Sequence, residues 1–438
     1  MLKQKDNPLR PEVIADLWRE SGLKNKLLFT LVMILVVRTG VHIPISGVNL
    51  DIIKDLFNQG NLLGFIDLFA GGAMAKFSLF AMGIIPYINA SIIIQLMTAV
   101  IPKLEELQKE GGESGRRQIA QITRYLTVIL ASVQAFGMSI WIWRSGAVLN
   151  APATGPAPVF FILDTAAVLI AGTVFMMWVG ELITEHGIGN GASLLIFIGI
   201  IARLPDYMTN TYQLVSTGGT NWFMVGILML IFLGIMVLIV YASEGSRRLP
   251  VQSAKRQVGN RMYGGRATYL PFRINQGGVM PIIFASSVML FPATIYQFAP
   301  VDFLKTVTQA LAPSQPLYAV AYIGLILFFT FFYASIILNP KDISDNLKRY
   351  GSFIPGYRPG RPTAEYIEYV LTRITFCGAV FLGFIALLPM VAEKGTGVVT
   401  FQGLGSTALL IMVGVAIDIF NQLQTHLLAR QYEGFMKQ

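Results

Sequence analysis

The sequence has few of the residues that most often carry chemistry. It contains one cysteine and three histidines in 438 residues. A single thiol, Cys377, excludes a disulfide framework and a cysteine-based metal cluster. Because it lies within an apolar stretch, we predict a packed core thiol. The motif GxxxxGK[ST] is absent too, which excludes a P-loop for ATP hydrolysis.

Charged residues are also scarce. They make up 13% of the chain, whereas apolar residues make up 54%. Soluble domains carry roughly 25% charged residues, so this composition excludes an ordinary soluble protein. The net charge of +9 therefore lies mostly in segments outside the apolar stretches. Such segments would suit anionic lipid headgroups, ribosomal RNA or an acidic partner protein.

Ten apolar stretches divide the chain. They run roughly over 27–45, 77–101, 125–143, 159–180, 188–202, 222–243, 277–298, 317–339, 374–392 and 404–422. Most are long enough to cross a hydrocarbon layer of about 30 Å as a helix. Most lysines and arginines lie before the first stretch, after the last one or in the even-numbered connections. By the positive-inside rule this places both termini in the cytoplasm and predicts an all-α membrane protein.

The stretches hold few ionisable residues near their midpoints. Arg38 and Asp164 lie toward the predicted outer ends, and Glu181 and Asp418 toward the inner ends. A proton- or sodium-coupled transporter normally needs buried carboxylates or broken helices near mid-membrane. A small-solute transporter is therefore the weaker alternative. A membrane-embedded enzyme is a third one, but no His/Asp/Glu constellation appears within the stretches.

One apolar segment is too short to span a membrane. Asn61–Ala70 is ten residues long and is followed by Gly71 and Gly72. One interpretation is a surface amphipathic helix on the outer face. The other is a re-entrant stopper that enters a pore from outside, with the two glycines as its hinge.

The second stretch contains two isoleucines on one helix face. Ile84 and Ile88 are four residues apart, with Pro86 between them predicted to kink the helix. Such isoleucines either face lipid or core, or form a dry collar that blocks ions by dewetting. Nearby polar residues in apolar surroundings predict interhelical hydrogen bonds. These residues are Asn89, Gln95 and, in the seventh stretch, Asn275.

Two predicted cytoplasmic connections are too long for simple turns. Segment 244–273 holds seven basic residues and one acidic residue, and segment 340–365 is rich in glycine, proline and tyrosine. They are either solvated loops that obey the positive-inside rule or structured docking surfaces. Their length and aromatic content favour docking.

Several long motifs, in order along nearly the whole chain, resemble the SecY/Sec61-alpha family of protein-conducting channel subunits. They are RTGVHIPISGVN (38–49), FAGGAMAKFSLFAMGIIPYINASIIIQL (69–96), GESGRR (112–117), GELITEHGIGNGASLLIF (180–197), NQGGVMPIIFASS (275–287) and NPKDISDNLKRYGSFIPGYRPG (339–360).

The resemblance implies ten transmembrane helices in two pseudo-symmetric five-helix halves around a central pore. The halves would be residues 1–202 and 203–438, with a short re-entrant plug helix in 61–75. The plug and hinge would be Leu62, Leu63, Phe65, Ile66, Leu68, Phe69, Gly71 and Gly72. The pore ring would be Ile84, Ile88, Ile196, Ile283 and Ile411. Ala192 stands where a sixth isoleucine is common, which predicts a looser ring on that side.

The resemblance also implies a lateral gate and a set of partners. The gate would carry Asn89, Gln95 and Asn275, and Arg256, Arg261 and Arg358 would dock the SecA motor or the ribosome. Asn260 replaces an arginine that often precedes Arg261. Further expected partners are SecE-like and SecG-like membrane subunits, signal peptides, unfolded preproteins and anionic lipids. No cofactor is expected, and the membrane would be a bacterial plasma membrane or a thylakoid membrane.

Overall fold

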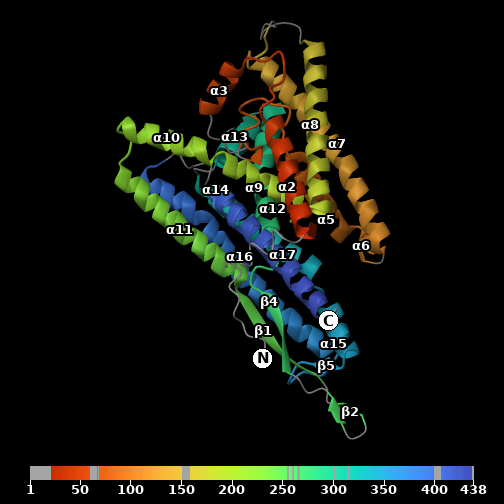
Figure 1. Ribbon diagram of the computed structural model, residues 1–438. Helices are drawn as coiled ribbons and strands as arrows, with labels where there is room; N and C mark the ends of the chain where they lie inside the picture. Colours follow the sequence, from red (N-terminus) through yellow and green to blue (C-terminus); the bar gives the residue numbers. More distant parts are fainter. Residues whose placement is uncertain are drawn as a thin grey trace.

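A computed structural model describes most of the chain. The described residues are 21–59, 67, 69–109, 111–149, 158–253, 256–258, 261–263, 267–298, 302–312, 315–398 and 406–436. Helices account for most of this structure (Figure 1).

Each of the ten predicted apolar stretches contains a helix. These helices are α2 (Ser21–Gly40), α5 (Ile85–Val100), α7 (Gly112–Arg144), α8 (Val159–His186), α9 (Gly191–Ala202), α11 (Trp222–Glu244), α12 (Met280–Phe298), α14 (Pro316–Ile337), α16 (Arg361–Thr396) and α17 (Ser406–Met436). Among the described residues five further helices connect them, namely α3 (Leu50–Gln59), α6 (Pro102–Lys109), α10 (Leu204–Ser216), α13 (Asp302–Ala310) and α15 (Pro340–Arg349).

Fewer than ten helices are both long and apolar enough to cross a membrane by themselves. Within the described ranges seven meet both conditions, or eight if α5 and α6, which meet at a 105° bend, form one span. The prediction of several membrane-spanning helices is confirmed at this level. Helix α5 is short because residues 77–84, which the second stretch included, form turns instead.

The expectation of an all-α protein is wrong in one region. Segment 244–273 contains the antiparallel pair β1 (Ser246–Ser253) and β4 (Ala267–Arg273), together with the small hairpin β2 (Arg256–Val258) and β3 (Arg261–Tyr263). Strand β5 (Ser352–Phe353), from the other long connection, pairs with the free edge of β1. Leu249 and Val251 of β1 are buried while their neighbours are exposed, and this period of two selects a strand.

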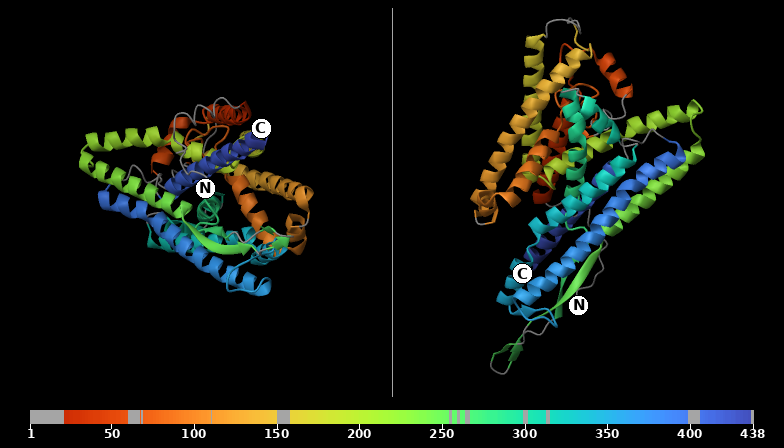
Figure 2. Two further views of the ribbon diagram at one scale, coloured as in Figure 1. Left: turned by 60° about the horizontal axis from the view of Figure 1, so that its bottom comes forward. Right: turned by 180° about the vertical axis from the view of Figure 1, so that it is seen from behind.

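Two hydrophobic cores follow from this arrangement. The larger core joins the membrane helices, and the smaller one packs β1 against Ile354 and the start of α16. Helix α16 runs through both cores and lies beside α11 (Figure 2). The two connections that pair through β1 and β5 are therefore packed against α16.

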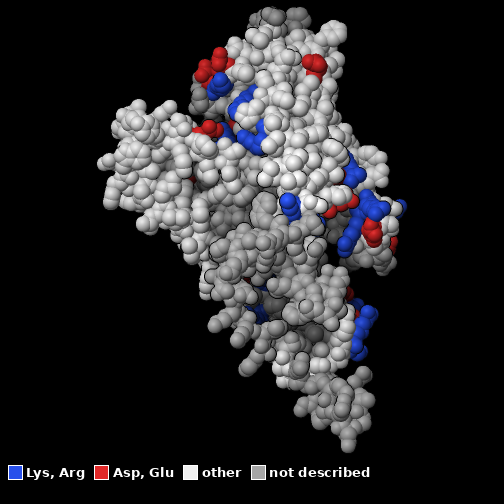
Figure 3. Space-filling model, viewed as in Figure 1, with Lys and Arg blue, Asp and Glu red and all other residues white. Residues whose placement is uncertain are grey.

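The outer surface of the helices is apolar. Leu230, Val237 and Tyr241 on α11 are each more than two-thirds exposed, and Figure 3 shows wide uncharged areas between charged clusters. In water this surface would be unfavourable, but it matches hydrocarbon. Cys377 on α16 is also exposed, so the prediction of a packed core thiol is wrong. It lies on the apolar outer surface rather than between helices.

Residues 70–84 form a buried series of turns between helices. Non-helical backbone this deep needs close neighbours, because its polar groups cannot reach water. A glycine of α8 allows one such approach, since a Cβ at Gly172 would lie 2.0 Å from the carbonyl oxygen of Leu79.

We therefore predict that Gly172→Ala destabilises the folded protein by roughly 1–3 kcal/mol through overpacking. The measurement is the thermal unfolding midpoint of the purified protein in detergent. Gly234→Ala on α11 is the matched control, because a Cβ there would meet no atom within 4 Å. Equal midpoints for both variants would contradict the packing described.

Candidate pore and plug seat

Ile84 and Ile88 are placed by the start of α5. Ile84 is the N-cap of the helix, and its carbonyl accepts a hydrogen bond from the Ile88 amide (3.1 Å). Pro86 occupies the first turn, where the missing N–H needs no partner. The prediction that Pro86 kinks this helix is therefore wrong, because the helix begins there.

Three of the five predicted ring residues line one cavity of about 410 Å³. Ile88 comes from α5, Ile196 from α9 and Ile283 from α12. Ile84 and Ile411 are almost fully buried in the same hydrophobic core but do not line the cavity. The structure thus brings together isoleucines that are far apart in the sequence. Ala192, which comes from the same helix as Ile196, also lines the cavity.

The cavity has a polar side as well. Ser91, Gln95, Glu181 and Glu185 line it together with Arg124. Arg124 Nε and Nη2 lie 3.0 and 2.9 Å from the two carboxylate oxygens of Glu181, which joins α7 to α8. A cavity lined in this way can hold water next to its polar residues and exclude water next to its apolar residues.

Asp67 is hydrogen-bonded to residues 72–75 near the C-terminal end of α9, opposite the end that lines the cavity. Asp67 is fully buried, and its Oδ1 accepts hydrogen bonds from the amides of Met74 (2.8 Å) and Ala75 (3.1 Å). Its Oδ2 lies 2.9 Å from Arg203 Nη1. Arg38 of α2 donates a hydrogen bond of 3.1 Å to the Gly71 carbonyl.

Both predicted hinge glycines have conformations that other residues rarely adopt. Their φ angles are +65° for Gly71 and +85° for Gly72. A Cβ at Gly71 would lie 2.8 Å from the Cα of Gly199 on α9. Gly71 therefore combines a left-handed turn with a close backbone approach. Phe69 is buried beside it, while Leu62, Leu63, Phe65, Ile66 and Leu68 lie outside the described residues.

Comparisons with known proteins place the chain in a family. The SecY family profile matches residues 78–420. A curated relative, "Protein translocase subunit SecY" of Synechococcus elongatus, is 47% identical over 440 residues and 98% of either chain.

The chain belongs to the SecY family.

Two solved structures share its fold at low sequence identity. One is described as "The plug domain of the SecY protein stablizes the closed state of the translocation channel and maintains a membrane seal" (17% identity, 93% of either chain, TM-score 0.65). The other is "Sec61 in the Canine ribosome-channel complex from the endoplasmic reticulum" (16% identity, 93% of either chain, TM-score 0.60).

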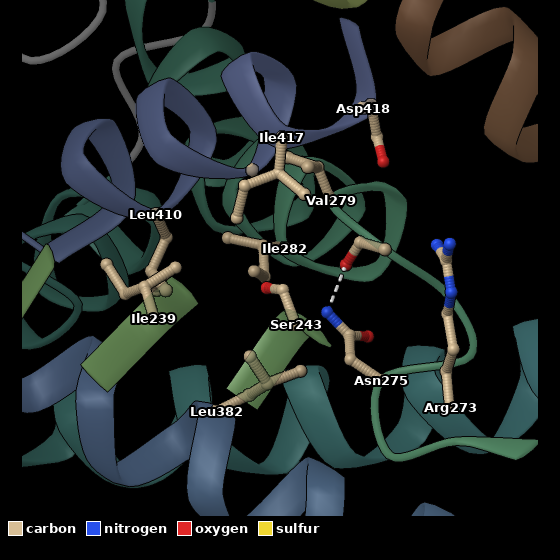
Figure 4. Close-up of a pocket in the computed structure, with 12 residues that line it drawn as sticks. Ile239, Ser243, Arg273, Asn275, Val279, Ile282, Leu382, Leu410, Ile417 and Asp418 are labelled. Carbon is tan, nitrogen blue, oxygen red and sulfur yellow. Dashed lines mark hydrogen bonds between the residues drawn. The ribbon is translucent and has the colours of Figure 1, made fainter. Parts of the chain in front are cut away.

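Two of the three predicted gate residues of this SecY-family chain make hydrogen bonds within their own segments. Gln95 Nε2 donates to Ser91 Oγ (3.1 Å), one turn back on α5. Asn275 Nδ2 donates to the Gly278 carbonyl (2.9 Å) ahead of α12, and its Oδ1 is buried without a hydrogen bond among the described residues (Figure 4). Asn89 is buried on α5. Because α12 contacts both α5 and α7, segments from the first and second halves of the sequence meet along this seam.

The predicted docking arginines fall into two groups. Arg256 and Arg261 lie in β2 and β3, and their side chains are outside the description, as is Asn260. Arg358 is exposed, and its backbone carbonyl accepts a hydrogen bond from Thr363 Oγ1 (2.7 Å). Its neighbour Tyr357 stacks on Tyr366 with ring centroids 4.0 Å apart. The loop around Arg358 is thus ordered, and its guanidinium is presented to solvent.

Two residues of the candidate site were missed as a pair from the sequence. Asp67 is a lone acid in an apolar segment, and Arg203 is a lone base after the fifth stretch. Opposite charges in two apolar regions on the same predicted side of the membrane were the available signal. Their pairing depends on packing that spacing does not reveal.

The Arg124–Glu181 ion pair is half exposed at the arginine, so we expect a small contribution to stability. Glu181→Gln should reduce the free energy of unfolding by less than about 1 kcal/mol. Unfolding midpoints in detergent measure the change, with the neighbouring exposed Glu185→Gln as the control. A loss of several kcal/mol specific to Glu181→Gln would show that the pair is structurally essential.

Proposed function

We propose that this chain is the central pore-forming subunit of a protein translocation channel. It passes unfolded preproteins across a membrane and releases apolar segments sideways into lipid. The observation that carries the proposal is the cavity lined by Ile88, Ile196 and Ile283. The other end of α9 carries what we call the plug seat, where buried Asp67 contacts Arg203. Membership of the SecY family and the name of the Synechococcus relative support the same function.

In this proposal the ten helices form two halves, residues 1–202 and 203–438, with the pore between them. The isoleucine ring (Ile84, Ile88, Ile196, Ile283 and Ile411) and the plug in 61–75 hold the resting pore shut. Branched apolar side chains at a constriction exclude water, and ions cannot cross without it. A signal segment would separate α5 from α12 near Asn89, Gln95 and Asn275 and bury its own apolar surface there.

The channel acts as a conduit rather than an enzyme, so a partner must supply the energy. The basic connections around Arg256, Arg261 and Arg358 are the proposed docking surface for a SecA-like motor or a translating ribosome. The pairing of β1 with β5 supports this, because it joins both connections into one firm platform. One structural neighbour is itself described in a ribosome-channel complex.

SecE-like and SecG-like subunits and anionic lipids are the proposed membrane partners. The membrane is a bacterial plasma membrane or a thylakoid membrane, with both termini in the cytoplasm. The apolar exposed faces of α11 and the other helices provide the area on which small membrane subunits and lipids would pack.

Transport itself tests the function. Proteoliposomes that contain the chain with SecE-like and SecG-like subunits should protect an unfolded preprotein from external protease when a SecA motor and ATP are added. Protection no greater than in liposomes without the chain would reject the proposal.

Removing the two α5 ring residues should open the resting pore. Ile84→Gly combined with Ile88→Gly should raise the resting ion conductance of a planar bilayer on the order of tenfold, because the constriction becomes wide enough to hold water. Ile94→Gly is the control, since Ile94 is also buried on α5 but lies away from the cavity. Equal conductance in the two variants would contradict the role of the ring.

Reversing the charge of Arg358 should slow motor-driven transport. Arg358→Glu should lower the rate on the order of tenfold, while folding is retained because only its backbone carbonyl makes a described hydrogen bond. Arg117→Glu on α7 is the control, since it makes the same charge change at an exposed site. Rates that fall equally in both variants would indicate a general charge effect rather than docking.

A further inference from the structure

The plug segment contains a charged group with no contact with solvent. Asp67 is 0% exposed and lies among apolar residues in the sequence. A buried carboxylate is unfavourable unless charge and hydrogen bonds compensate it. Both kinds of compensation are present, and they come from different parts of the chain.

The two oxygens of Asp67 have separate partners. Oδ1 accepts the amides of Met74 and Ala75, and the Asp67 carbonyl accepts the Gly72 amide at 3.1 Å. These bonds join Asp67 and residues 72–75 into one compact unit. Oδ2 lies 2.9 Å from Arg203 Nη1, outside that unit. One oxygen therefore shapes the plug segment and the other connects it to α9.

A single face of α9 receives this unit. Ile196, Gly199 and Arg203 are separated by three and four residues, the spacing of neighbours on one helix face. Ile196 lines the cavity, Gly199 contacts Gly71, and Arg203, next after the helix, pairs with Asp67. The same face thus joins the pore ring to the plug seat.

We propose that Asp67 and Arg203 are positioning residues that hold the plug in the closed channel. This inference rests on the proposed function and adds the contact that keeps the resting state closed. Arg38 provides a second attachment, a hydrogen bond from its guanidinium to the neutral Gly71 carbonyl. When a nascent chain displaces the plug, the whole unit moves away and the pair is exchanged for water.

The pair is suited to be broken and remade. Arg203 keeps 19% of its side chain exposed, so water can reach its guanidinium as soon as the plug lifts. Its guanidinium also lies 5.9 Å from the ring centroid of Tyr207, which keeps the arginine near the seat when Asp67 leaves. Removing one partner by mutation would leave the other charge buried without compensation, which is costly in the closed state.

Resting ion conductance of the reconstituted channel tests the pair. Asp67→Asn keeps Oδ1 for Met74 and Ala75 but places an uncharged amide opposite Arg203. We expect it to raise time-averaged conductance on the order of tenfold, and Arg203→Gln to do the same. Because the two substitutions remove the same interaction, the conductance of the double variant should equal that of either single variant. Arg203→Lys, which keeps the charge, should remain near the wild-type value.

Arg144→Gln and Asp164→Asn are the matched controls, since both residues are exposed. They should leave conductance unchanged. Wild-type conductance in Asp67→Asn, or a double variant whose increase is the product of the two single ones, would overturn the proposal. If Arg203→Gln fails to insert into the membrane, the conductance of Asp67→Asn is compared with that of Arg203→Lys instead.

A parallel measurement separates this inference from the proposed function. The Ile84→Gly, Ile88→Gly channel and wild-type preprotein transport are recorded in the same preparation. Suppose that the Ile84→Gly, Ile88→Gly channel has raised conductance, wild-type transport is normal and Asp67→Asn has wild-type conductance. That result rejects only the Asp67–Arg203 contact. If wild-type transport is absent and the ring variant does not raise conductance, the proposed channel function is rejected, and the proposed Asp67–Arg203 contact is rejected as well.

Discussion

Everything in this fold depends on satisfying backbone polar groups away from water. Helices do so within themselves, which is why they make up most of the chain. Residues 70–84 differ from the helices, because they turn repeatedly and are mostly buried. Their amides and carbonyls bond within the turns, to Asp67, and to Arg38 and Ile43. Glycines on neighbouring helices leave the space that this irregular backbone requires.

The same constraint accounts for the two parts of the proposed closed pore. A collar of isoleucines excludes water by its chemistry alone and needs no polar partner. The plug unit contains polar backbone, so it needs a seat with charge and hydrogen bonds. Helix α9 serves both parts through one face. Displacing one part therefore disturbs the surroundings of the other.

Much of this fold could be predicted from the sequence. Every predicted apolar stretch holds a helix, and the pair Gly71-Gly72 does form the turn after the plug segment. Hydrophobic patterning decides such features locally. The role of Pro86 was predicted wrongly, because a proline at the first turn and one within a helix look alike until the start of the helix is known. The β1–β4 pair was missed, since its alternation covers only a few residues within a basic segment.

The site could be predicted in part. Ile88, Ile196 and Ile283 meet at one cavity, whereas Ile84 and Ile411 lie in the surrounding core. The contact between Asp67 and Arg203 could not be derived, because nothing in the spacing of two distant residues fixes their distance.

The pairing of β5 with β1 has a consequence for chimeric proteins. Two connections separated by several helices share one small sheet and one small core. A connection exchanged by itself with that of a distant relative would lose its strand partner and expose the apolar side of β1. Grafts that alter partner choice in this protein should therefore transplant both connections together, as a single module.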